Sequence, residues 1–382
     1  DNFAQAGWLA PYGARVADFS PKEYVKPRKS LKVMAREIQM AFAAAEMAVA
    51  DAGLEVGQFD SERSGVVLGA GSMYCDLEEL VEAYRACATA EGFDFSKWGQ
   101  GALGELFPLW MLKYLPNMTP CHIGIAHDAR GPSNSIVAGD VSGLLAIIEA
   151  AHVIRRDDAD VMIAGGASSS VGLMDLMWHA GARLSRRVDE PQRACRPFDA
   201  DRDGIVGGEA AALFVLERRT HAEARGAKAL ARILGHGQRN EAAVESLNPS
   251  GRAVRQAIAV AMEDSGVAAN DLGHVNAHGL STKVDDRFEA KAIRATLGDA
   301  PVTALKSYLG NSGPAAGAVE LAIGLIGMHH GVTPPTLNYE TPDPECPLNV
   351  VVESQPTTRR AMMKLSHRTT GQAVALIVEA CG

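Results

Sequence analysis

The stretch GPSNSIVAGDVSG, residues 131–143, has the pattern of a strand that breaks sharply into a helix. A Gly-Pro turn leads into a short β-branched segment, Ile136 and Val137, and small residues then lead into an apolar helical pattern that begins at Val141. Many α/β enzymes place their nucleophile where a buried strand breaks sharply into a helix. The residue at this break is Asp140. The stretch therefore predicts the fold of an α/β enzyme and raises the question of whether the chain still performs the chemistry.

Apolar runs with the length of buried strands alternate with Ala-rich helical patterns on both sides of this stretch. The strand-like runs lie at 64–71, 160–168, 211–217, 274–279 and 374–380, and the helical patterns lie at 31–54, 141–156, 251–267 and 317–331. Strands covered on both faces read as continuous apolar runs, whereas helices repeat apolar residues every three or four positions. The alternation predicts the α/β class, with mostly buried strands.

The order of these elements is duplicated. In the first half a strand-like segment gives way to the helix at 141–156, and in the second half 302–313 gives way to the helix at 317–331. We expect two similar α/β halves, 1–225 and 226–382, whose strand ends face a shared central cleft, since open sheets bind ligands at their strand ends. The chain lacks an initiator methionine, so we expect its start, and the first strand of the N-terminal half, to lie upstream.

Composition and charge exclude several classes of protein. The 382 residues are 47% hydrophobic and 22% charged, which fits a globular chain, and the net charge of −9 argues against nucleic acid or an anionic membrane as a partner. The six cysteines show no CxxC pairing, so neither disulfides nor a zinc site are expected. No run reaches the length of a membrane span, and the N-terminus lacks a signal-peptide pattern. These features predict a cytoplasmic protein.

Three patterns that can mark metal or cofactor sites fail in detail. DADRDG at 199–204 opens like a calcium loop, but the glutamate it needs falls at Ala210, one place after Glu209. His329 and His330 are adjacent on a helical pattern and cannot share a face. The glycines at 165–166 lack a full dinucleotide-binding pattern. We therefore expect no metal and no cofactor.

Four further segments, met in order along the chain, carry a resemblance to a known family. They are RPFDADRDGIVGGEAAALFVLE at 196–217, VNAHGLSTKVDDRFEAKAI at 275–293, ALKSYLGNSGPAAGAVE at 304–320 and GVTPPTLNYETPDPECPLNVV at 331–351. Together they resemble the β-ketoacyl synthases, the elongating condensing enzymes of the thiolase superfamily. The resemblance runs over nearly the whole chain. It implies a thiolase-like fold, in which two α/β halves form a five-layered α-β-α-β-α core.

The resemblance also assigns roles to residues of this chain. In the family, a cysteine at the strand-to-helix break is acylated by an acyl carrier protein, and two histidines assist the decarboxylation of a malonyl thioester. This chain has Asp140 at the cysteine position, His278 as the first histidine, Lys306 as the family's lysine and Asn311 at the second histidine. The family's Gly-rich, Phe-bearing gating loop is replaced. Its position is occupied by Ser366, His367, Arg368, Thr369 and Thr370.

The change at position 140 removes normal condensation. Acyl transfer from a thioester to a carboxylate would produce a mixed anhydride, which is less stable than the thioester, so the transfer runs uphill. Asp140 then has two interpretations. It is a structural residue, because aspartate is a good N-cap at a helix start, or its charge holds a nearby His278 protonated as a hydrogen-bond donor.

The resemblance implies two functions of different kinds. The first is a non-condensing subunit, similar to a chain-length factor, which binds acyl carrier protein and forms a homodimer, or a heterodimer with a Cys-bearing ketosynthase. The second is an acyl-thioester enzyme, such as a malonyl-carrier-protein decarboxylase that uses His278 and Asn311. A changed reaction, such as thioester hydrolysis with Asp140 as base, stays open, and a Cys121 thiol directed into the acyl tunnel would overturn the loss of condensation.

A basic run at 26–36 is the candidate docking site for the carrier protein. It contains Lys26, Arg28, Lys29, Lys32 and Arg36. Carrier proteins of these pathways are acidic, so a basic surface would attract them. The alternative is an ordinary solvated start of a helix.

Overall fold

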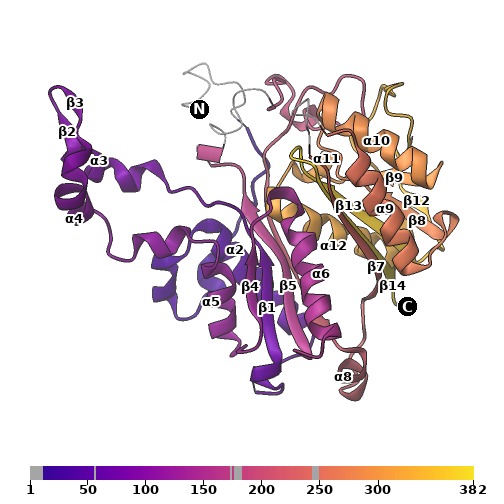
Figure 1. The fold of residues 1–382 in the computed structure, drawn as a ribbon, viewed down its shortest axis with the longest axis horizontal. Coiled ribbons are helices and arrows are strands. Elements are labelled where there is room, and N and C mark those ends of the chain that lie inside the picture. Colours follow the sequence, from indigo (N-terminus) through magenta and orange to yellow (C-terminus); the bar gives the residue numbers. More distant parts are fainter. Residues whose placement is uncertain (1–11, 56, 173, 176–182, 243–248) are drawn as a thin grey trace.

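Two β-sheets organise the molecule. The computed structural model describes residues 12–55, 57–172, 174–175, 183–242 and 249–382 (Figure 1). The first sheet has the order β4-β1-β5-β6 and the second the order β11-β9-β8-β13-β14-β7. The strands of the first sheet are β4 (Ser133–Ile136), β1 (Ser64–Gly69), β5 (Val161–Ser169) and β6 (Glu209–Glu217). Those of the second are β11 (Asn349–Val350), β9 (Pro301–Thr303), β8 (Leu272–Asn276), β13 (Ala361–His367), β14 (Gln372–Ala380) and β7 (Ala231–Asn240).

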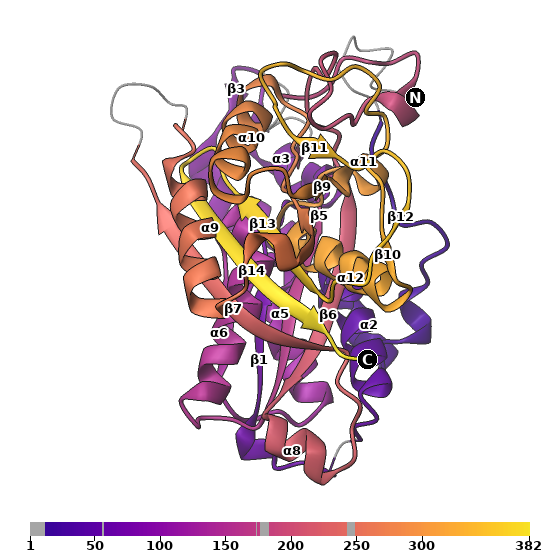
Figure 2. The same cartoon turned by 90° about the vertical axis from the view of Figure 1, so that its right-hand side faces the viewer.

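Helices cover both sheets and fill the space between them. The outer face of the first sheet packs on α2 (Arg36–Asp51) and α5 (Met118–Ala126), and the outer face of the second packs on α9 (Arg252–Ser265) and α10 (Lys283–Leu297). Figure 2 shows α9 lying along β7 and β14. Between the sheets lie α6 (Ser142–Arg155) and α12 (Ala316–His329), which contact each other. These five layers confirm the predicted thiolase-like α-β-α-β-α architecture.

Each strand-like run and each helical pattern singled out in the sequence corresponds to an element of the same kind. The strand before Asp140 ends earlier than predicted. Strand β4 stops at Ile136, and Val137 lies outside it with its side chain exposed (53%). The segment 302–313 is largely not a strand: after β9 comes the short helix α11 (Lys306–Leu309). The remaining elements are α8 (Arg219–Ala224) and the short pair β10 (Val332–Thr333) and β12 (Gln355–Pro356).

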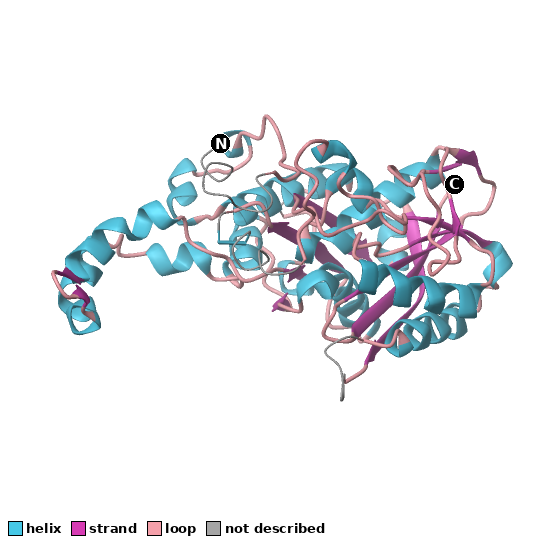
Figure 3. Cartoon of the chain, turned by 90° about the horizontal axis from the view of Figure 1, so that it is seen from above, coloured by secondary structure: helices cyan, strands magenta, loops and turns pink. Residues whose placement is uncertain are grey.

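One segment projects from the body. It comprises residues 77–114, here called the arm, and contains α3 (Val81–Cys87), the hairpin β2 (Ala88–Thr89) and β3 (Gly92–Phe93), and α4 (Leu103–Glu105). Figure 3 shows it from above, reaching away from the body on the side opposite the C-terminus. Its small core holds Ala83, Cys87 and Ala102. Several large apolar side chains of the arm stay exposed: Tyr84, Phe93, Phe95, Leu103, Phe107, Leu109 and Met111.

Close backbone contact between the two halves brings the start of α6 against the second half. A Cβ atom at Gly143 would lie 2.7 Å from the carbonyl oxygen of Pro314, which is in the short 3-10 helix Gly313–Ala315 before α12. A Cβ atom at Gly69, at the end of β1, would lie 2.4 Å from the Gly143 nitrogen. Glycine at these positions therefore lets the strand end, the start of α6 and the 311–315 segment meet.

We expect Gly143→Ala to destabilise the fold by about 1–3 kcal/mol, because the added methyl group would meet backbone that cannot move aside cheaply. Urea unfolding followed by circular dichroism measures the change. Gly104→Ala is the matched control, since its Cβ would enter open space in α4, and we expect its effect to stay within about 1 kcal/mol. Equal stability of the two variants would contradict the close contact at Gly143.

None of the helices in the described residues is long and apolar enough to cross a membrane. Over the same residues, no group of three or more histidine, cysteine, aspartate or glutamate side chains is arranged to hold a metal ion.

Candidate active site

Asp140 sits at a sharp elbow between β4 and α6. Gly139 has a φ of 59°, and residues Gly139–Val141 form one 3-10 turn before the α-helix begins. Asp140 makes no capping hydrogen bond to the helix, so the predicted N-cap role is wrong. Ser142 supplies the local contacts instead: its Oγ accepts from the Ala138 N–H at 2.8 Å and donates to the Gly139 carbonyl at 2.7 Å. The carboxylate of Asp140 instead faces side chains of the C-terminal half.

The structure brings the predicted residues His278 and Asn311 to this carboxylate. The Nε2 atom of His278 lies 3.7 Å from Asp140 Oδ2, and the Asn311 Nδ2 atom donates to Asp140 Oδ1 at 3.4 Å. The orientation of the Asn311 amide is set by its oxygen, which accepts from the Gly313 N–H at 3.3 Å. His278 is fully buried and the Asp140 side chain is 23% exposed. Residues from both halves thus meet around one carboxylate.

Lys306 fixes the protonation state of His278. Its Nζ atom lies 3.1 Å from His278 Nδ1 and donates to the His278 carbonyl at 2.9 Å. An ammonium group can only donate, so Nδ1 is the acceptor and the proton of the neutral ring is on Nε2, directed toward Asp140. Burial and then Lys306 place the pKa of His278 well below its ordinary value. The expectation that Asp140 keeps His278 protonated is wrong, although His278 remains a hydrogen-bond donor.

Three buried charged residues that the sequence analysis missed hold this arrangement. Glu320 on α12 bridges two ammonium groups: its Oε1 lies 2.7 Å from Lys306 Nζ, and its Oε2 pairs with Lys364 Nζ. Glu289 on α10 accepts the backbone N–H groups of His278 at 2.6 Å and of Gly279 at 2.9 Å. Burial alone would raise the pKa of Glu289, but neighbouring imidazoles and these N–H groups bring it to about 2.

The residues at the gating-loop position do not act as one group. Ser366 and His367 are buried, and Thr370 is exposed. The Arg368 guanidinium lies over the elbow, because a Cβ atom at Gly139 would be 2.6 Å from Arg368 Nε. Thr369 Oγ1 accepts from the Arg183 guanidinium at 3.0 Å. These positions therefore hold a buried imidazole and a guanidinium that lies against Gly139.

Cys121 and Cys195 are two thiols that could serve as alternative nucleophiles. Cys121 is exposed on α5, on the outer side of the first sheet. Cys195 is buried, and burial raises the pKa of its thiol to about 12, so it carries almost no thiolate near neutral pH. Neither thiol takes the place of the side chain at the elbow, which is that of Asp140.

Four of the five basic residues predicted for docking are exposed. Lys26, Arg28, Lys29 and Lys32 lie on the turn-rich segment before α2. Arg36 departs from the prediction. Its Nε atom donates to Glu209 Oε2 at 2.8 Å, and the Glu209 side chain is fully buried, so this guanidinium is engaged inside the protein.

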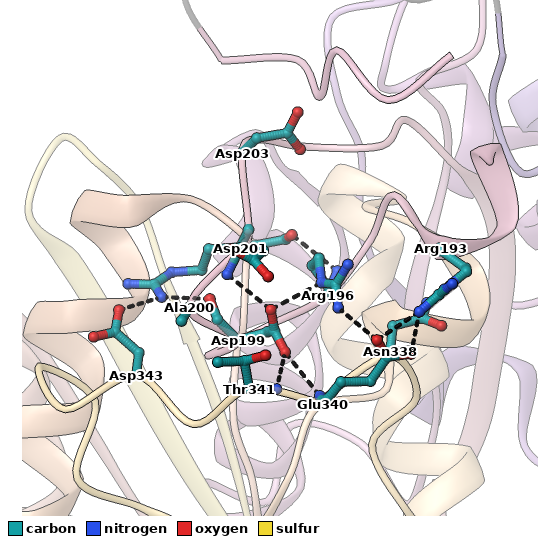
Figure 4. Close-up of polar contacts among 12 residues, drawn as sticks. Arg193, Arg196, Asp199, Ala200, Asp201, Asp203, Asn338, Glu340, Thr341 and Asp343 are labelled. Carbon is teal, nitrogen blue, oxygen red and sulfur yellow. Dashed lines mark hydrogen bonds and ion pairs between the residues drawn. The ribbon is translucent and has the colours of Figure 1, made fainter. Parts of the chain in front are cut away.

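The calcium-like stretch at 199–204 is a structural loop. Asp199 accepts from the backbone N–H groups of Glu340 and Thr341 at 2.7 Å each (Figure 4). Asp203 points away from Asp199, and its carboxylate binds Ser185 Oγ at 2.7 Å and the Arg186 N–H at 2.9 Å. The acidic side chains diverge and are already used, which agrees with the rejection of a calcium site.

Known proteins resemble the chain over most of its length. The family profile of the β-ketoacyl synthase N-terminal domain matches residues 6–222, and that of the C-terminal domain matches residues 230–340. The tetracenomycin polyketide synthase ketoacyl synthase alpha subunit of Streptomyces glaucescens is 34% identical over 362 residues, which cover 90% of this chain and 81% of that protein.

Solved structures agree with this match. A β-ketoacyl synthase from Burkholderia phymatum STM815 superposes with a TM-score of 0.85 at 31% identity, covering 97% of this chain and 88% of that one. The ishigamide ketosynthase/chain length factor gives a TM-score of 0.82 at 26% identity, covering 98% and 91%. Sequence, fold and site geometry agree: this chain belongs to the β-ketoacyl synthase family.

Proposed function

We propose that this chain is a non-condensing subunit of fatty-acid or polyketide synthesis, which completes a dimer with a Cys-bearing ketosynthase in the manner of a chain-length factor. The observation that carries the proposal is the Asp140 carboxylate at the elbow, facing His278 and Asn311. Transfer of an acyl group from a thioester to this carboxylate would raise the free energy, because the product is a mixed anhydride. The fold is kept while the step that defines a condensing enzyme is lost.

The exposed apolar side chains of the arm support the proposal that another chain binds there. The exposed rings of Tyr84, Phe93 and Phe95 cluster around Trp98, and exposed apolar clusters of this kind mark interaction sites. Strand β4 is the edge of the first sheet, so one side of its backbone is without a strand partner among the described residues. An open edge strand and an apolar arm together fit an interface with another chain of the same fold.

The test is co-purification with a Cys-bearing ketosynthase. We expect a stable complex on size-exclusion chromatography, weakened by about tenfold or more when Phe93 and Phe95 are both changed to serine, because exposed aromatic anchors dominate such interfaces. Leu230→Ser is the control, since Leu230 is 55% exposed but lies outside the arm. A complex that tolerates the double change as well as the control would contradict the use of this surface.

Carrier-protein docking gives a separate expectation. Lys29→Glu with Lys32→Glu is expected to weaken binding of acyl carrier protein by about tenfold at low salt, because reversing two charges turns attraction to an acidic partner into repulsion. Surface plasmon resonance at two salt concentrations measures it. Lys291→Glu, an exposed lysine on α10, is the control. Equal binding by the double variant and the control would remove the basic segment from the docking surface.

A second candidate function is decarboxylation of a malonyl thioester on the carrier protein. It is favoured by two hydrogen-bond donors that face the same carboxylate, that of Asp140: His278 Nε2–H and the Asn311 amide. The carbon–carbon bond to the carboxylate breaks, carbon dioxide leaves, and its bonding electrons form an enolate whose oxygen both donors would stabilise. The enolate carbon then takes a proton from solvent to give the acetyl thioester.

Mass spectrometry of malonyl-loaded carrier protein separates the two functions. Loss of carbon dioxide that disappears in His278→Gln supports the decarboxylase. An inert protein that still forms the complex with a Cys-bearing ketosynthase supports the subunit alone. A covalent acyl adduct on the wild-type chain would overturn both.

A further inference from the structure

His367 is a buried imidazole inside the site. It ends β13 and is 2% exposed. Its ring lies against that of His278, with centroids 4.4 Å apart and planes at 63°, and against Phe288 at 4.9 Å. Among the described residues, neither ring nitrogen of His367 has a hydrogen-bond partner, and the same holds for Nε2 of His278. Buried polar atoms without partners are uncommon and mark places where a ligand or a proton acts.

Sheet topology explains why the two imidazoles meet. Strands β8 and β13 are parallel neighbours, with Asn276 opposite Lys364. His278 follows β8 by two residues and His367 follows Lys364 by three, so both leave the sheet at the same edge. The carboxyl ends of neighbouring parallel strands are where open sheets assemble their sites.

Glu289 connects the two rings. One carboxylate oxygen accepts the His278 N–H, and the other accepts the Gly279 N–H and lies 3.5 Å from His367 Nε2. The same side chain therefore holds the backbone that carries His278 and faces the ring of His367. A change of the His367 side chain would therefore act on both Glu289 and His278.

We propose that His367 supplies the second imidazole of this site, which Asn311 does not, and that it acts as a positioning residue through Glu289 and His278. Lys306 occupies Nδ1 of His278, whereas Nε2 of His367 faces the Glu289 carboxylate at 3.5 Å. The charged groups around this pair of rings are Lys306, Lys364, Glu289, Glu320, Arg368 and Asp140. The activity arm of the following test depends on the second proposed function, and the spectroscopic arm does not.

The activity arm uses chemical rescue. We expect His367→Gly to lower the rate of malonyl decarboxylation by about tenfold to a hundredfold, since a small misplacement of the donor His278 costs this much. Added imidazole should restore the rate, whereas thiophene, a ring of similar size without nitrogen, should not. His367→Phe fills the space and should keep the fold but stay inactive. Equal rescue by thiophene, or full activity of His367→Phe, would overturn the proposal.

The spectroscopic arm follows the histidine rings of the whole chain by 1H–15N NMR at about pH 7. We expect the His278 ring to carry its proton on Nε2 in the wild type, and its nitrogen signals to move in His367→Phe, because that change removes the imidazole that packs against His278 and faces Glu289. His329→Gln, on an exposed histidine, is the matched control and should leave the His278 signals in place. If the wild type is inert, the decarboxylase function fails and this arm decides alone. His278 signals that are the same in the wild type and in His367→Phe would overturn the proposal.

Discussion

Replacing Glu320 with glutamine is expected to destabilise the protein by about 3–5 kcal/mol. Its carboxylate is 1% exposed and is the shared counter-ion of Lys306 and Lys364, which are equally buried. The neutral amide would leave two buried ammonium groups close together without a compensating charge. Burial and the charge of Lys306 already bring the pKa of Lys364 to about 8 against the opposing effect of Glu320, so Lys364 would shed its proton or the cluster would open.

Urea unfolding measures this loss, with Glu345→Gln as the matched control. Glu345 pairs with Arg287 at 3.0 Å, but the two side chains are 55% and 39% exposed, so the same substitution should cost less than about 1 kcal/mol there. If Glu320→Gln does not fold, the triple change to Leu at Glu320 and Met at both lysines removes every charge and should recover folded protein. A loss at Glu320 as small as at Glu345 would contradict the buried cluster.

The fold followed from local patterns because its central elements are apolar on every side. The run 64–71 has no charged residue and 160–168 has only Asp160, at its start, so both fit buried strands, and the helix at 141–156 shows its period clearly. The segment that became α10 was different. Its charges resemble a solvated helix, yet Asp285, Asp286 and Glu289 are buried because backbone N–H groups and arginines from distant loops meet them.

The sequence predicted those site residues that belong to recognisable family motifs. Asp140, His278, Asn311 and Lys306 come together as the family resemblance implied. The state of His278 was not predictable, because it depends on a contact with Lys306 across 28 positions of the chain. The two errors concerning Asp140 share one cause: the sequence places a residue at an elbow, but only the neighbouring side chains decide which groups the carboxylate faces.

Asp140→Cys is expected to turn an inert elbow into an acyl acceptor. The thiol would stand two residues before α6 begins at Ser142, where the helix N-terminus favours the thiolate. Exchange between two thioesters is close to balanced: the new carbon–sulfur bond forms as the bond to the carrier breaks, and the carrier leaves as a thiol. The wild-type carboxylate has no such balanced step, so the acylated fraction should rise from none to most of the protein.

Intact-mass spectrometry after incubation with acyl-loaded carrier protein measures this gain, and iodoacetamide labelling tests the thiol without any substrate. Asp140→Ser is the control, because a hydroxyl at the same place has a far higher pKa and should remain unmodified. The exposed Cys121 of the wild type supplies the background labelling rate. A thiol at position 140 that reacts with iodoacetamide but takes no acyl group would mean that the cleft, with Arg368 over the elbow, no longer admits an acyl chain. Acylation of the wild-type chain would contradict the proposal that Asp140 abolishes condensation.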